Sequence, residues 1–563
     1  MVLVATGCYG GSDGNASGAE TDGSGDDDGG SAGDDDGVDG GSDDGDGDDG
    51  VPDDLDPLSV LEPLAARLND IQYRNTVLDL FGETLTEQEV QWLPRDVPIE
   101  GSYSTSAEAQ GFNAQYVLGY AYIARGITER LDLDAVQMQF GDCTGVDAAC
   151  IDDFVAGLGL RMFRRPLDET ERQTYADLAD AIASDPDTSD DDVVRGVIQA
   201  LMQAPAFLYR LERETEGTAG EVRRIDGYEL ASRLSYFLWQ STPDAALLQF
   251  AAGPDGDGDF DGSALPAEVD RMIADAKFAR ARTNFWGDYS LASTSSFGTT
   301  DPDLAEELRD SLFATLDRIS GVDADAQPLS ALFDGQEIVM SPAVADIAGA
   351  ESLGPGLQVY DVALAEERIG VITHPSFLSA IGTTSFVGRG VFMTERLLCQ
   401  HTPPPPEDVA EDIMMTAQAT EDLTPREASE FRFGLEPVCV GCHTQFEPIA
   451  YGFERYGADG RYSLTDEQGR DLFSDGVLPA GADRPEIVFA DAAELLSALG
   501  DLDPVHRCLV ENMAEFGYGR PAHWAGEFLP NAVTGFQDDG LTFDALVGAL
   551  AGSDQLFYMR IVE

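Results

Sequence analysis

The chain has 563 residues, a length that predicts several domains rather than one hydrophobic core. Its 105 acidic residues against 33 basic residues give a formal net charge of −72. Such a chain repels phosphate groups, so no nucleic acid partner is expected and direct binding to anionic lipid headgroups is disfavoured. No run of 18 or more apolar residues is present, so we expect no transmembrane helix.

The first eight residues are typical of the end of a bacterial lipoprotein signal. In this interpretation Gly7 precedes the cleavage point and Cys8 becomes the lipidated first residue. A positively charged start is missing, and the alternative is an ordinary N-terminus with an incidental cysteine. From Gly10 to Asp56 the chain holds 18 acidic residues, no Lys or Arg and almost no apolar side chains. We therefore expect residues 1–56 to be a truncated signal and a disordered acidic tether, which would hold a folded body away from a membrane.

After Pro57 the apolar residues recur at helix spacing as far as Phe81, and Gly82 stands where a C-cap belongs. A second helix is predicted over about 152–162, and Asp168 is expected to cap a third. Further amphipathic segments cover residues 191–211, 226–239, 266–286, 302–320, 387–399, 492–500, 503–517 and 541–554. Strand signals are few and short, over 337–340 and 358–363. The predicted fold class is mainly α.

The pentapeptide Cys439-Val440-Gly441-Cys442-His443 spells C-x-x-C-H, the attachment signature of c-type haem. On one helical turn, Cys439 and Cys442 can each bond to a haem vinyl group, and His443 can serve as the proximal iron ligand. The alternatives are a zinc site, which needs a second ligand pair, a redox dithiol, and a plain disulfide. The motif thus predicts covalent haem c in a cytochrome c-like region near the C-terminus.

The sequence offers several candidates for the sixth iron ligand. Met513, on a predicted amphipathic helix, is one candidate; a methionine ligand would suit electron transfer, whereas an open position would suit small-molecule chemistry. Each methionine is more often a core residue than a ligand. The other candidates are Met393, Met414, Met415, His401 and His506.

Four further cysteines can be paired by position. Cys143 and Cys150 would close a small loop, and Cys399 and Cys508 would join two C-terminal segments. This pairing fits an oxidising compartment, although buried free thiols are also common.

Residues 257–268 fit the template of a calcium-binding EF-hand loop. Asp257, Asp259, Asp261 and Glu268 fall at positions 1, 3, 5 and 12, and Gly262 at position 6. Pro266 inside the loop, and the abundance of Asp-Gly in the chain, favour a chance match instead. Calcium is therefore a second possible cofactor.

Several arginines and tyrosines also have a predicted role. Four such side chains lie near the haem motif: Tyr451, Arg455, Arg461 and Tyr462. They could hydrogen-bond the haem propionates, or the arginines could instead face solvent or form ordinary ion pairs. Arg389 and the pair Arg164-Arg165 are expected to fix loops by hydrogen bonds. No hydrolase or nucleotide-binding motif is present.

Several stretches of the chain together resemble a known protein family. The chain resembles the large planctomycete-type cytochrome proteins, whose five domains are the families of unknown function numbered 1587, 1595, 1592, 1588 and 1585. The stretches that carry it are RLNDIQYRNTVLDLFG (67–82), FVAGLGLRMFRRPLDETE (154–171), YELASRLSYFLW (228–239), CVGCHTQFEPIAYGFERYGADGRY (439–462) and CLVENMAEFGYGR (508–520). Where the pattern has Asp-Pro after the haem motif, this chain has Glu447-Pro448, which keeps a carboxylate.

The resemblance implies five domains after the tether. They are a 1587-like helical domain at 57–125, a 1595-like helical domain at 150–211, a 1592-like helical domain at 215–345, a 1588-like cytochrome-type domain at 362–465 and a 1585-like helical domain at 485–563.

The resemblance implies an exported haem protein but no substrate. The favoured hypothesis is a lipid-anchored c-type cytochrome that transfers electrons to a redox partner protein in the cell envelope, on the periplasmic or surface side. One alternative is a haem-dependent oxidoreductase acting on a small molecule or polymer. The other is a surface scaffold or binding lipoprotein in which C-x-x-C forms a structural bridge.

Overall fold

A computed structural model describes residues 65–94, 102–107, 110–111, 113–212, 218–256, 258–321, 327–365, 367–402, 415–416, 418–435, 437–520 and 529–561. For 437–439 and 554–555 only the backbone is described. Cys8, the tether at 1–56, Asp257 and Met414 lie outside these ranges. The described chain is mainly helical with a few two-stranded sheets, which confirms the predicted fold class. No helix within the described ranges is both long enough and apolar enough to cross a membrane.

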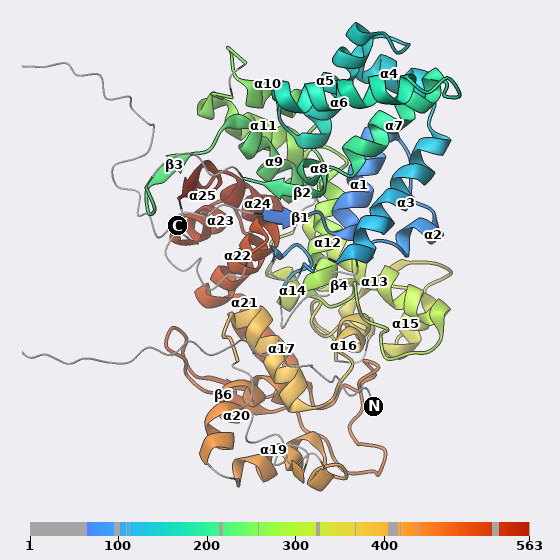
Figure 1. Cartoon of the computed structure of the whole chain (residues 1–563). Coiled ribbons are helices and arrows are strands. Elements are labelled where there is room, and N and C mark those ends of the chain that lie inside the picture. The colour runs from blue at the N-terminus through green and yellow to red at the C-terminus, as the bar shows by residue number, and fades with distance from the viewer. Residues whose placement is uncertain are drawn as a thin grey trace, which may run out of the picture. The chain divides into compact units, whose positions relative to one another are not determined.

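The first group of elements surrounds one hydrophobic core (Figure 1). It consists of β1 (Ala65–Arg67), α1 (Asp70–Phe81), α2 (Glu87–Val90), α3 (Ala114–Arg130), α4 (Leu133–Gly141), α5 (Ala148–Phe163), α6 (Glu169–Ala183), α7 (Asp190–Met202), α8 (Pro205–Leu208) and β2 (Tyr209–Leu211). Helices α3, α5 and α6 contact α7, and the core they enclose runs from Leu68 to Leu208 and takes in Tyr236.

Capping explains where these helices begin and end. Asn69 accepts a hydrogen bond from the Gln72 backbone N–H, so α1 starts at Asp70 rather than just after Pro57 as the periodicity predicted. Ala65–Arg67 instead forms β1, which is paired with β2. Gly82 ends α1 in the left-handed conformation, and Asp168 caps α6, as predicted.

The second group lies between the first group and the C-terminal elements in sequence. It consists of β3 (Val222–Arg224), α9 (Gly227–Leu238), α10 (Ala245–Ala252), η3 (Gly262–Ala264), α11 (Leu265–Ile273), α12 (Phe278–Tyr289), α13 (Pro302–Ser320), α14 (Ala331–Asp334), β4 (Glu337–Met340), α15 (Pro342–Ile347), β5 (Gln358–Asp361), η4 (Val362–Leu364) and α16 (Pro375–Ile381). The two predicted strands are confirmed as β4 and β5, which pair antiparallel.

Two segments that were each predicted as one continuous amphipathic stretch are divided into shorter elements in the structure. The segment 266–286 is two helices, because Asp275 accepts a hydrogen bond from the Lys277 backbone N–H in a turn that separates α11 from α12. The segment 191–211 breaks before Pro205, since proline lacks the N–H that would continue α7.

The third group contains the haem motif. It consists of α17 (Phe386–Leu398), α19 (Pro425–Phe433), α20 (Pro437–Ala450), η6 (Tyr451–Phe453), β6 (Gly476–Leu478), β7 (Ile487–Phe489), α21 (Ala492–Gly500), α22 (Asp503–Tyr518), α23 (Leu529–Asp538), α24 (Phe543–Ala551), α25 (Asp554–Phe557) and β8 (Tyr558–Arg560). The second and third groups share one core, from Ile225 to Met559, that also includes Tyr103.

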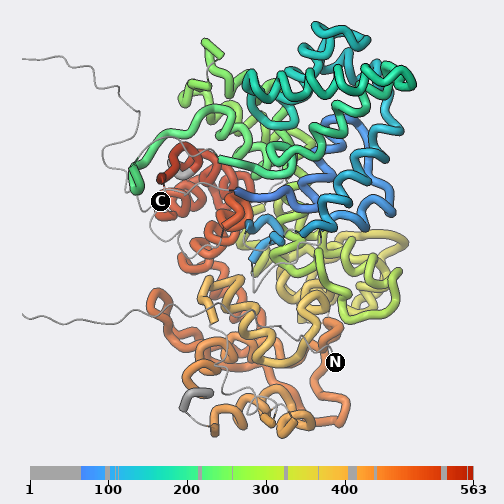
Figure 2. Tube along the Cα trace, in the orientation of Figure 1, coloured from blue at the N-terminus to red at the C-terminus, as the bar shows by residue number. Residues whose placement is uncertain are grey.

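Segments far apart in sequence are joined at several places. Strand β3 pairs antiparallel with β8 near the end of the chain. In Figure 2 the green segment that contains β3 lies beside the red C-terminal part of the chain. Tyr103 donates a hydrogen bond to Asn512 at 2.7 Å, and the Arg396 guanidinium lies 4.6 Å from the Tyr103 ring centroid. The buried cores therefore do not follow the five expected domains one by one.

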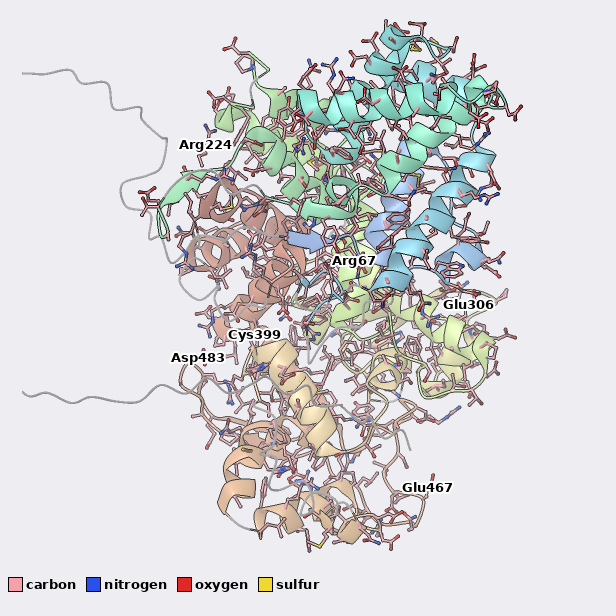
Figure 3. The ribbon with its side chains drawn as sticks, viewed as in Figure 1. Arg67, Arg224, Glu306, Cys399, Glu467 and Asp483 are labelled. Atoms are coloured by element: carbon pink, nitrogen blue, oxygen red, sulfur yellow. A yellow bond between two sulfur atoms is a disulfide. The ribbon has the colours of Figure 1, made fainter. Side chains whose placement is uncertain are left out.

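Both predicted disulfides are present. Cys143 and Cys150 are bonded with Cα atoms 5.7 Å apart, and Cys399 and Cys508 with Cα atoms 5.2 Å apart. Cys399, labelled in Figure 3, follows the last residue of α17, so its bond fastens that helix to α22.

Because the two disulfides close loops of different length, removing each should lower the free energy of unfolding by a different amount. The Cys399–Cys508 bond joins residues 109 positions apart, and the Cys143–Cys150 bond joins residues 7 positions apart. Replacing Cys399 and Cys508 with alanine should lower the unfolding free energy by about 5 kcal/mol, and replacing Cys143 and Cys150 by about 2 kcal/mol. Urea unfolding of the two double variants, followed by tryptophan fluorescence, measures both. Equal losses would contradict the loop-length argument.

Candidate functional site: the C-x-x-C-H helix

Helix α20 carries the whole C-x-x-C-H motif. Cys439, Cys442 and His443 all lie on this helix, as the motif requires. The side chain of Cys439 lies outside the described part of the chain, whereas Cys442 is half-buried and has a free thiol. The thiol of Cys442 is thus not consumed by a disulfide.

His443 is held by a carboxylate one helical turn further along. Its Nδ1 lies 2.7 Å from Oε1 of Glu447, and its ring packs on Phe446 with centroids 5.1 Å apart. An ionised carboxylate can only accept, so Nδ1 carries the proton and donates it. With Nδ1 as the donor to Glu447, Nε2 is the ring nitrogen that is available to bind a metal ion.

Glu447 is fully buried and paired with an arginine. Arg432, on α19, donates from Nε to the same Oε1 at 2.5 Å, and the Glu447 side chain is 0% exposed. Burial opposes ionisation, but hydrogen bonds from His443, Arg432 and Ser429, with the charge of Arg432, hold the pKa of Glu447 below its usual range. The carboxylate is therefore a fixed negative charge beneath His443.

A layer of polar side chains continues this network. Ser429 and Tyr451 share a hydrogen bond of 3.0 Å between their hydroxyls. The guanidinium of Arg426 lies 4.8 Å from the Tyr451 ring centroid and bonds the buried Glu454 at 2.9 Å. These contacts connect α19 to η6 and to Glu454, the residue that follows η6.

Helix α17 packs closely against α20 (Figure 1). The contact is at Gly390, where an added Cβ would lie 2.3 Å from the Phe446 carbonyl oxygen and 3.2 Å from the Glu447 Cα. The absence of a side chain at Gly390 therefore lets the two helix backbones meet beside the residues that contact His443.

Arg389, next to Gly390 on α17, binds the segment that follows α20. It is 0% exposed, and its guanidinium donates to the carbonyls of Phe453 at 2.5 Å and Gly457 at 2.8 Å. Burial lowers the pKa of Arg389 to about 10, which still leaves it charged at neutral pH. Arg164 likewise donates to carbonyls and Arg165 to Glu171, so the structural role predicted for these arginines is confirmed.

The residues present fit a covalently attached haem. The described donors are the free Cys442 thiol and the Nε2 atom of His443, whose side chain is 22% exposed. Within the described ranges, no three His, Cys, Asp or Glu side chains gather to hold a metal ion, so no second ligand pair for zinc is found there.

The candidates for the sixth ligand are spread over the structure. Met513, on α22, is 1% exposed in the shared core, and Met393, on α17, is 0% exposed there. Both nitrogens of His506 have partners, the Gly500 carbonyl and Gln537, while His401 and Met415 are exposed. Met513 as iron ligand stays a prediction.

His374 is fully buried in the protein interior. Its Nε2 lies 3.1 Å from the Val339 carbonyl oxygen, and its Nδ1 accepts from the Ser376 backbone N–H. Burial lowers its pKa to about 4, so it is neutral and structural.

The side chains predicted to bond propionates have partners within the protein. Arg455 donates to the Leu472 carbonyl and to Tyr462, Tyr451 bonds Ser429, and Arg461 pairs with Asp346 at an exposed position. Their role toward a haem stays a prediction.

The described carboxylates of the EF-hand-like loop do not converge. Asp259 pairs with Arg224, labelled in Figure 3; Asp261 caps η3 through Ser263; and Glu268 bonds Arg271 within α11. Asp257 is outside the described residues, and calcium here stays a prediction that the described contacts do not favour.

Sequence reasoning missed Arg432 and the contact between Glu447 and His443. The signal for that contact was the separation of four residues, because residues i and i+4 are neighbours on a helix face. Nothing in the sequence indicated that Arg432, on another helix, meets the same oxygen.

Four family models match the chain, and each is described as a protein of unknown function. In chain order they are PSD3 (DUF1587) at residues 66–132, PSD5 (DUF1595) at 150–212, PSD4 (DUF1592) at 225–349 and PSCyt3 (DUF1588) at 368–466. Helix α20 lies inside the last match. DUF1585 is absent from the matches, so the fifth domain at 485–563 stays a prediction. No curated protein and no solved structure is significantly similar to the chain.

The contact at Gly390 makes a stability prediction. Alanine there must displace the Phe446 carbonyl, so Gly390→Ala should lower the unfolding free energy by about 2 kcal/mol. Gly548, inside α24, has open space around an added Cβ, so Gly548→Ala should be neutral or stabilise by up to about 1 kcal/mol. Thermal and urea unfolding compare the two, and a Gly390→Ala protein as stable as Gly548→Ala would refute the close contact.

Proposed function

Because the chain belongs to the planctomycete-type cytochrome proteins, with four of their domains in order, we propose that it is an exported c-type haem protein that transfers electrons in the cell envelope. The observation that carries the proposal is the state of His443: Nδ1 is bonded to a buried carboxylate, which leaves Nε2 free for iron.

Each residue of the motif has a role in this proposal. Cys439 and Cys442 hold haem by thioether bonds, and His443 provides the proximal ligand. When bound, haem supplies one-electron redox chemistry. Glu447 keeps the Nδ1 proton in place and fixes the imidazole ring, Arg432 fixes Glu447, and the α17–α20 contact holds this helix against the body.

We also propose that its electron partner is an envelope protein with a basic surface. Only 18 of the 105 acidic residues lie between Gly10 and Asp56, so most of the negative charge belongs to the rest of the chain. A partner rich in Lys and Arg would be attracted to it, with an association rate that falls as salt is added. A lipid on Cys8, followed by the acidic tether, would keep the protein at the membrane where such a partner is found.

The proposal predicts covalent haem. After expression with the c-haem maturation machinery, the protein should show a pyridine haemochrome spectrum and a mass increase of one haem. Both should vanish in Cys439→Ala/Cys442→Ala and persist in the control Cys143→Ala/Cys150→Ala, which removes a distant cysteine pair.

Two results would overturn this assignment. A wild-type protein with no haem mass after maturation contradicts it, and a mass two hydrogens lower at Cys439 and Cys442 would indicate a structural bridge and a scaffold role. Carbon monoxide binding to the reduced protein reports whether the sixth position is open, as an oxidoreductase would need.

A further inference from the structure

The partner of the proximal histidine is a charged side chain rather than a backbone carbonyl. A histidine that binds a metal usually donates its other ring N–H to a carboxylate, a backbone carbonyl or water, and this partner sets how basic the ligand is. In this chain the partner is Glu447 Oε1, 2.7 Å from Nδ1. The choice of a carboxylate therefore has electronic consequences for whatever His443 binds.

We propose that Glu447, fixed by Arg432, is a positioning residue that gives His443 partial imidazolate character and thereby lowers the reduction potential of the attached haem. This inference rests on the proposed function, because it requires haem on α20. Beyond the proposed function, it names the interaction that lowers the reduction potential of the haem.

The physical reason is electrostatic. A hydrogen bond to an ionised acceptor is stronger than one to a neutral carbonyl, and it pulls the Nδ1 proton toward the carboxylate. The ring then becomes a stronger donor through Nε2, which stabilises the more positively charged, oxidised iron. The reduced form gains less from this donor, so the potential falls.

Burial makes the effect large. The Glu447 side chain is 0% exposed, so neither water nor salt separates its charge from His443. An exposed carboxylate at the same distance would be screened, and its hydrogen bond would exchange with water. The effect of Glu447 on His443 therefore depends on its burial.

Arg432 makes a buried negative charge possible at this position. A carboxylate is costly to bury unless a cation or hydrogen-bond donors are paired with it. The Arg432 side chain is 10% exposed, and its Nε donates to Glu447 Oε1 at 2.5 Å, so it pairs with the buried charge and orients the carboxylate. Since both donors meet the same oxygen, Arg432 also limits how far the Nδ1 proton moves toward Glu447.

The test is the midpoint potential of the haem-loaded, full-length protein. Glu447→Gln keeps the shape of the side chain and removes its charge. At a fixed solution potential, the ratio of oxidised to reduced haem should fall at least tenfold, a rise of about 59 mV for a one-electron couple. Mass and haemochrome spectra confirm that haem is still attached.

Two further variants isolate the cause. Glu447→Asp keeps the charge, and the ratio should change no more than threefold. Glu430→Gln removes an equal charge from an exposed position on α19, the helix of Arg432, and the ratio should change less than twofold. The inference is wrong if Glu447→Gln carries haem at the wild-type potential, or if Glu430→Gln shifts the potential as far as Glu447→Gln does.

A measurement on the wild-type protein keeps the inference testable if Glu447→Gln fails to fold. The iron–imidazole stretching frequency, read by resonance Raman spectroscopy just after photolysis of the carbon monoxide complex, rises with imidazolate character. It should lie above the range of imidazoles bonded to a backbone carbonyl, and a frequency within that range overturns the inference. A wild-type protein without attached haem would instead overturn the proposed function itself.

Discussion

The close contact between α17 and α20 is the constraint on which the site depends. At Gly390 the two helix backbones meet beside Phe446 and Glu447, and no other residue type fits without displacing a carbonyl. The same helix α17 carries Arg389, which binds the carbonyls beyond α20, and leads into Cys399, which is bonded to α22. One helix thus connects the haem motif to the shared core, so that the orientation of His443 is set by the body of the protein rather than by a loop.

Buried arginines connect segments in a chain that has few cations. Arg389 joins α17 to the region after α20, Arg164 joins the end of α5 to the backbone at Ala206 and Tyr209, and Arg368 donates to the carbonyls of Thr373 and Gly460. A guanidinium suits this use because its planar fork presents several donors and stays charged when buried. Arg432 differs from these three, because it is bonded to a carboxylate, Glu447, that also contacts the candidate iron ligand His443.

Local signals predicted the elements well where a cap or a proline fixes the boundary. The helix ending at Gly82, the capped start at Asp168 and the segment 302–320 were all predicted from residues within a few positions of the boundary. The prediction failed for Ala65–Arg67, whose apolar spacing is helical but which pairs as a strand with residues near 210. Periodicity could not distinguish these outcomes, because the partner strand lies more than a hundred residues away.

By itself the sequence determined the mainly helical class, the four matched domains in order, the two disulfides and the helix that carries Cys439, Cys442 and His443. These depend on short-range patterns or on the pairing of a few rare residues. Only the tertiary structure decided that two hydrophobic cores serve the described domains, that β3 pairs with β8, and that Arg432 meets Glu447 under His443. The physical reason is that side chains on different helices interact only after packing brings them together, and packing depends on shape and burial across the whole chain rather than on spacing along it.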